Sequence, residues 1–97
     1  MHVISRRALL EFARKHPDAA APLRTWYRLM ARTSFQTLDE LRRTFPSADL
    51  VGGLVVFNVG GNKYRLILIA SLHFNRQKVY IRHVLTHAEY DRGRWKP

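Results

Sequence analysis

The chain has 97 residues, of which 46% are hydrophobic, and this predicts one small folded domain over residues 1–97. It contains no cysteine, which excludes disulfides and thiol chemistry, and no membrane span or signal peptide is visible, so a cytoplasmic protein without membrane contact is expected. Seventeen Lys and Arg against seven Asp and Glu give a net charge of +10, which predicts a polyanionic partner.

The chain opens with the pattern of a short strand followed by a helix. The β-branched residues Val3 and Ile4 indicate a brief edge strand, and Ser5 is a good helix N-cap. Apolar residues at helical spacing then predict a helix over Arg6–Lys15. Pro17 ends this helix, because the residue before a proline avoids the α conformation.

A second helix is expected from a start within residues 18–22 to about Arg32. Its apolar stripe includes Trp26 and Tyr27, and the stripe assigns both residues to the core. A second stripe carries the arginines Arg24, Arg28 and Arg32. This row is either a solvated face or a contact for a polyanion.

A third, shorter helix is expected before the middle of the chain. Thr37 and Glu40 form a capping box at its start, and Pro46 ends it. The following residues, 47–53, are expected to form a loop, since they end in two glycines.

The second half predicts the main sheet, with strands at residues 54–59, 64–74 and 78–85. A Gly-Gly-Asn turn at residues 60–62 joins the first two strands, because these residues tolerate the positive φ angles of a hairpin. The strand at 64–74 is apolar on both faces, which is typical of a central strand that is covered on both sides. The helices upstream are expected to cover the buried face of this sheet.

The last of these strands alternates between two faces. Val79, Ile81 and Leu85 are expected on the buried face, with His83 among them as a partly buried, hydrogen-bonded histidine. The opposite face is expected to present Lys78, Tyr80 and Arg82.

A short helical turn is expected after the last strand. Thr86 and Glu89 form a second capping box, and the turn places His87 and Tyr90 three residues apart on one side. The basic tail at residues 92–97 contains a tryptophan and is expected to be mobile.

A cationic sheet face is the main chemical feature of the sequence. The chain has no metal-binding motif, nucleophile elbow or P-loop, so neither a metal nor a cofactor is expected. Cations can hold a phosphate whose charge grows in a transition state, histidine can exchange a proton near neutral pH, and aromatic rings can stack on unpaired bases. These residue types fit metal-independent RNA cleavage and RNA binding alone equally well.

Two blocks, VVFNVGGNKYRLI at residues 55–67 and KVYIRHVLTHAEYD at 78–91, resemble the HigB-type toxins of bacterial toxin–antitoxin modules, in the RelE-like superfamily. The N-terminal strand and helix are similar too, so the resemblance covers nearly the whole chain. It implies an α+β, RelE-like fold in which N-terminal helices pack on a small, mainly antiparallel sheet. The matching positions are Asn58, Asn62, Arg65, Lys78, Tyr80, Arg82, Thr86, His87 and Tyr90.

The resemblance implies an endoribonuclease, an mRNA interferase that acts on mRNA on the ribosome and thereby inhibits translation. It also implies neutralisation by a HigA-type helix-turn-helix antitoxin, with operator DNA bound only through the complex of the two proteins. Two alternatives stay open: a non-catalytic RNA- or ribosome-binding module, and a gyrase-inhibiting toxin of the same superfamily.

The catalytic candidates are five residues with distinct expected roles. Arg65 and Arg82 would hold the scissile phosphate, and Lys78 would add charge or act as a base. His87 and Tyr90 would transfer a proton or position the substrate, although a local cap for His87 and packing for Tyr90 are equally open. The expected RNA-binding residues are Lys63, Tyr80, Arg24, Arg28 and Lys96.

Overall fold

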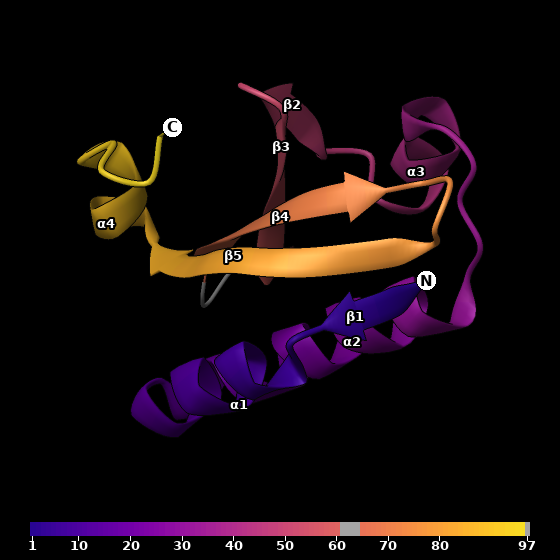
Figure 1. The fold of residues 1–97 in the computed structure, drawn as a ribbon. Helices are drawn as coiled ribbons and strands as arrows, with labels where there is room; N and C mark the ends of the chain where they lie inside the picture. The colour runs from indigo at the N-terminus through magenta and orange to yellow at the C-terminus, as the bar shows by residue number, and fades with distance from the viewer. Residues whose placement is uncertain (61–64, 97) are drawn as a thin grey trace.

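The computed structural model describes residues 1–60 and 65–96, and Figure 1 shows the arrangement of their helices and strands. The sheet lies between α1 and α2 on one side and the C-terminal segment with α4 on the other. In chain order the elements are β1 (His2–Ile4), α1 (Arg6–Lys15), a 3₁₀ turn (Pro17–Ala19), α2 (Ala20–Arg32), α3 (Leu38–Thr44), β2 (Asp49–Val51), β3 (Leu54–Gly60), β4 (Arg65–His73), β5 (Lys78–Thr86) and α4 (His87–Asp91).

Local capping places the helices where the sequence predicts them. The Ser5 hydroxyl accepts a hydrogen bond from the Arg7 amide at 3.2 Å, and the Thr37 hydroxyl accepts one from the Glu40 amide at 3.2 Å. The Glu40 carboxylate reaches one residue further back than a capping box requires and accepts from the Gln36 amide at 2.7 Å. These bonds satisfy amides that a helix start leaves without intrahelical partners.

The five strands form one sheet in the order β1-β5-β4-β3-β2. Among the strands of the described residues, β1 and β5 run parallel and the other neighbours are antiparallel, so the expectation of a mainly antiparallel sheet is confirmed. β4 occupies the centre and is buried on both faces from Leu66 to Ala70, as its uninterrupted apolar sequence predicts. Gly61 and Asn62, part of the predicted hairpin turn, lie outside the described residues.

The expectation of a loop over residues 47–53 is wrong, because β2 pairs there with β3. Gly52 and Gly53 have φ angles of 55° and 82°, the positive values that a tight two-residue hairpin turn requires. The two glycines therefore connect two paired strands and do not end a loop. The structure places Asp49–Val51 at the edge of the sheet.

A β-bulge at Arg82 changes the expected faces of β5. His83 lies opposite Ile69 and Ile81 opposite Ala70, so Arg82 has no partner residue on β4. One extra residue reverses the alternation of every residue after it. The prediction that Leu85 shares a face with Ile81 is therefore wrong: Leu85 packs in the cluster on the other side of the sheet.

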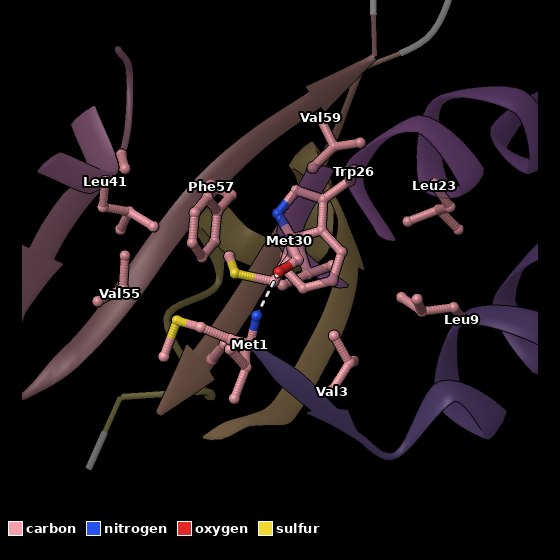
Figure 2. Close-up of a cluster of buried hydrophobic side chains, with 14 of the residues drawn as sticks. Met1, Val3, Leu9, Leu23, Trp26, Met30, Leu41, Val55, Phe57 and Val59 are labelled. Carbon is pink, nitrogen blue, oxygen red and sulfur yellow. Dashed lines mark hydrogen bonds between the residues drawn. The ribbon is translucent and has the colours of Figure 1, made fainter. Parts of the chain in front are cut away.

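The larger core lies between the sheet and the N-terminal helices. Trp26 of α2 meets Phe57 of β3 at a ring-centroid distance of 5.5 Å with an angle of 76°, which is an edge-to-face contact. Trp26 is only 3% exposed, so its assignment to the core is confirmed. Figure 2 shows this cluster, in which Leu9 and Leu23 come from the two long helices.

The Met1 amino group is part of the same core. It donates hydrogen bonds to the carbonyl oxygens of Met30 at 2.8 Å and Thr33 at 2.7 Å, the first of which is drawn in Figure 2. These carbonyls lie at the end of α2, where helix geometry leaves acceptors without intrahelical partners. Burial lowers the pKa of this amino group.

The C-terminal segment packs on the second face of the sheet, so the expectation of a mobile tail is wrong for Trp95. This side chain is 6% exposed and lies in a cluster with Val56, Ile67 and Ile69. The sequence analysis named no segment that would cover these apolar side chains, and the tryptophan covers them. Burying the indole and the side chains beneath it removes apolar surface from water, which favours the ordered position of this segment.

Candidate nucleic-acid interface

One end of the second sheet face carries a polar and aromatic patch. Tyr80 of β5 lies opposite Ser71 of β4, and Lys78 lies opposite His73. The His73 and Tyr80 rings meet edge to face, with centroids 5.2 Å apart at 83°, and the Ser71 hydroxyl lies 3.4 Å from His73 Nε2. A half-exposed tyrosine supported in this way is a suitable platform for an unpaired base.

Ser71 and His73 were not among the residues that the sequence analysis selected. The sequence analysis treated the whole strand at 64–74 as apolar on both faces, and so it overlooked the polar residues at the end of that strand. Alternation was the signal that could have found them, because positions 71 and 73 have the same parity as Ile67 and Ile69 and so share their face. Cross-strand pairing then brings them to Tyr80 and Lys78.

Arg82 presents its side chain from the bulge. The side chain is exposed, and its guanidinium carbon lies 5.8 Å from the centre of the Tyr80 ring, which is a cation–π distance. Because the Arg82 side chain is exposed and forms no ion pair with any residue in 1–60 and 65–96, its guanidinium is available to a ligand, and a phosphate can be bound bidentately. Tyr80 and Arg82 are thus two predicted site residues that the fold does bring together.

A groove of about 550 Å³ separates α1 from the second half of β5. Arg82 and His83 line it from the strand, and Phe12 and Arg14 line it from the helix. His83 is partly buried as predicted, but the prediction that it shares a face with Ile81 is wrong, because the bulge places it opposite Ile69 on the other face. No residue that the structure describes hydrogen-bonds its ring, and His83 lies beside Arg82 in the lining of this groove.

The end of the sheet near α4 holds the other catalytic candidates. His87 is the exposed first residue of α4. Tyr90 stacks on Trp95 with centroids 5.1 Å apart at 12°, and the Trp95 indole donates to the Tyr90 carbonyl at 3.0 Å. Of the two open interpretations of Tyr90, this geometry favours packing of the final turn.

Arg65 belongs to the same end of the sheet by its backbone. It pairs with Gly60, and its neighbour Leu66 lies opposite Thr86, the residue that caps α4. The side chain of Arg65 and the whole of Lys63 lie outside the described part of the chain. Their predicted roles therefore stay predictions.

The candidates are too widely spread to act on one phosphate. Lys78 and His87 are nine positions apart along β5, which corresponds to roughly 30 Å at the rise of a strand. Arg24 and Arg28 are exposed on α2, in the helical layer on the other side of the sheet, and Lys96 is exposed on the tail. The surface divides into the Tyr80–Arg82 region, the α4 end and a separate basic helix face.

Few of the cations are paired. In residues 1–60 and 65–96 two ion pairs form, Arg7 with Glu11 at 3.1 Å and Arg42 with Asp49 at 3.6 Å. Neither pair includes a candidate site residue, so Arg82 keeps its charge available to an anion. Among the same residues, no group of three or more His, Cys, Asp or Glu could hold a metal ion, and no helix is long and apolar enough to span a membrane.

The capping box of α4 should make stability depend on pH. The Glu89 carboxylate accepts from the Thr86 amide at 2.9 Å, and this backbone hydrogen bond lowers the pKa of Glu89 below its usual 4.5. The folded state therefore favours the ionised form. The resulting stabilisation is complete above the unfolded-state pKa and is lost as the pH falls through the lower pKa of the folded state.

We expect Glu89→Ala to lower the free energy of unfolding by about 0.5–1 kcal/mol at pH 7, as for other lost helix caps. The difference from the wild type should shrink as the pH falls below 4.5. Urea unfolding at pH 7 and at acid pH measures both effects. The matched variant Glu11→Ala removes an exposed carboxylate from α1 and should change stability little at either pH.

Comparison with known proteins identifies the family of this chain. The family model described as HigB_toxin, RelE-like toxic component of a toxin-antitoxin system, matches residues 19–93. The chain is 38% identical over 95 residues to the "mRNA interferase HigB" of Escherichia coli O6:H1, covering 95% of this chain and 90% of that protein. It is 40% identical over 94 residues to the "mRNA interferase toxin HigB" of Escherichia coli K12, covering 94% and 88% respectively.

The chain therefore belongs to the HigB toxin family, and its α+β fold agrees with the RelE-like description of that family. Membership in a toxin–antitoxin family implies an antitoxin as partner. The resemblance inferred from the blocks at residues 55–67 and 78–91 is thus confirmed over nearly the whole chain.

Proposed function

We propose that this protein is a metal-independent endoribonuclease of the mRNA interferase type. Its relatives at about 40% identity are named mRNA interferases. The observation that carries the proposal is the exposed guanidinium of Arg82 at the bulge, beside the Tyr80 ring and in one groove with His83. A phosphate-binding cation, a stacking ring and an imidazole are the groups that RNA cleavage needs.

In the proposed reaction the ribose 2′-oxygen attacks the adjacent phosphorus as a base removes its proton. The bond to the 5′-oxygen of the next nucleotide breaks, and an acid protonates that oxygen. The products are a 2′,3′-cyclic phosphate and a free 5′-hydroxyl. Arg82 would hold the phosphate oxygens as their charge grows, with Arg65 as a second candidate, and Tyr80 would stack a base. His83, which lies beside Arg82, is the candidate for proton transfer at this phosphate, and His87 with Arg65 would act instead if the scissile phosphate lies at the α4 end.

The proposed substrate is translated mRNA on the ribosome, which places the action in the cytoplasm. The proposed partner is a HigA-type helix-turn-helix antitoxin, and operator DNA would be contacted only through the complex. Arg24, Arg28 and Lys96 would add sequence-independent attraction to RNA, because arginine and lysine neutralise backbone phosphates. Lys78, at the far end of β5, would serve the same purpose along the bound strand and not at the scissile phosphate.

Brief induction of the toxin in bacteria, followed by mapping of new RNA 5′ ends, tests this proposal. We expect new ends within translated mRNA, phased with the reading frame, and their disappearance when the antitoxin is co-expressed. Growth arrest without new ends would contradict the proposal and indicate a non-catalytic ribosome-binding module. Arrest with DNA damage and no RNA cuts would indicate a gyrase inhibitor.

A further inference from the structure

The groove between α1 and β5 extends away from Arg82 toward the last turn of α1. Arg14 and Lys15 lie in that turn and line the groove on the side opposite the strand. The sequence analysis assigned them no role beyond the helix. In the structure they share one concave surface with Arg82, the central residue of the proposed reaction site.

The groove exists because β1 is short. β1 pairs with β5 at Lys78, Val79 and Tyr80, and no other strand of the described residues pairs with the outer edge of β5 from Ile81 onward. Figure 1 shows β1 ending well before β5 reaches α4, with α1 running beneath the uncovered part. The floor of the groove includes apolar side chains, among them Phe12 and Val84. Such a floor accepts sugars and base edges while the rim binds phosphates.

The charge of the groove is strongly positive. Arg14, Lys15 and Arg82 contribute three cations, whereas the lining includes one carboxylate, Glu11, which is bound to Arg7 at 3.1 Å. Arg14 and Lys15 have no ion-pair partner among residues 1–60 and 65–96. Cations in the last turn also complement the helix dipole, but Arg42 and Arg43 of α3 occupy the same kind of position without lining this groove.

We infer that this groove binds the backbone of the single-stranded RNA next to the scissile phosphate, with Arg14 and Lys15 each contacting one phosphate. The inference rests on the proposed function, because Arg82 links the groove to the reaction site. Two cations beyond Arg82 hold the strand in register, so that the scissile phosphate stays at Arg82. Phosphate contacts of this kind position a strand and do not read its sequence.

The test measures binding of purified toxin to a short single-stranded RNA whose 2′-hydroxyls are methylated, so that it cannot be cleaved. Arg14→Gln combined with Lys15→Gln should weaken binding by roughly tenfold, because phosphate contacts dominate affinity for nucleic acids. The slope of log affinity against log salt should fall by about 1.4, since each phosphate contact to a single strand contributes about 0.7.

Arg43→Gln combined with Arg76→Gln is the matched control. It removes the same charge from α3 and from the turn between β4 and β5, where both side chains are exposed and form no ion pair among residues 1–60 and 65–96. Both elements lie at the end of the molecule opposite α4 in Figure 1. We expect the control to leave the salt slope within error of the wild type. If the control lowers the slope as much as the groove variant does, the loss of net charge explains the effect of the groove variant, and the inference is overturned.

Two further results would also overturn it. Wild-type toxin that does not bind the RNA, or a groove variant that binds it like the wild type, would show that no strand occupies the groove. A groove variant that binds RNA normally but loses the antitoxin would assign the groove to the protein partner. If the groove variant loses RNA affinity and salt slope while the wild type cuts no mRNA, the groove inference stands and the proposed nuclease activity fails.

Discussion

Replacing Arg82 with glutamine is expected to lower the rate of RNA cleavage by roughly 10²–10³-fold while the protein stays folded. The rate should fall because a charged donor aimed at the phosphate stabilises the transition state, and removal of one such donor typically has this effect. The fold should persist because the side chain is exposed and has no partner on β4. Single-turnover cleavage of translated mRNA, together with urea unfolding, measures both quantities.

Two further variants make the Arg82 experiment specific. Arg82→Lys keeps the charge but loses the planar fork, so we expect an intermediate rate if bidentate phosphate binding matters. Arg43→Gln removes an exposed arginine from α3 and should cleave like the wild type. Wild-type rates in Arg82→Gln, with cuts at the same positions, would remove Arg82 from the reaction site and leave the α4 end as its location.

Replacing Trp95 with alanine is expected to lower the free energy of unfolding by about 3 kcal/mol, near the lower end for loss of a buried large aromatic side chain. The lower end applies because the segment that follows α4 can detach from the sheet while the larger core on the other face stays packed. The indole covers Val56, Ile67 and Ile69 and stacks on Tyr90. Urea unfolding monitored by circular dichroism measures the loss.

Trp95→Phe is the matched variant for this experiment. It keeps an aromatic ring against Tyr90 but removes the hydrogen bond from the indole to the Tyr90 carbonyl. We therefore expect a loss of about 2 kcal/mol, from one hydrogen bond and from the smaller buried ring, which is less than for Trp95→Ala. Unfolding of Trp95→Ala within 0.5 kcal/mol of the wild type would mean that the tail does not pack on the sheet.

The Arg82 and Trp95 experiments distinguish a residue that is expected to act in the reaction from one that is expected to stabilise the fold. Arg82→Gln should remove activity without loss of stability, because Arg82 protrudes from the bulge. Trp95→Ala should remove stability and also loosen α4, because Tyr90 is held by the indole through its ring and its carbonyl. If Trp95→Ala lowers cleavage more than its loss of folded protein explains, then the position of His87 contributes to the reaction.

The sequence by itself determined the helices, the three central strands and the family. Caps and prolines act within a few residues, so Ser5, Thr37 and Pro17 place the helix ends without tertiary information. The central position of β4 followed from its apolar run, since only a doubly covered strand can be apolar on both faces. The residue types of the site, cations with Tyr80 and histidine, were equally visible.

Only the tertiary structure decided where those residues lie relative to one another. The edge strand β2, the bulge at Arg82 and the packed Trp95 depend on pairing or contact with segments distant in the chain. A bulge shifts the pairing of a strand by one residue. Its free energy therefore depends on which side chains are buried on each face of the sheet with the bulge and without it. For that reason the sequence predicted Arg82 as one of an alternating row, whereas the fold places it at a bulge beside Tyr80, at the edge of a groove that α1 completes.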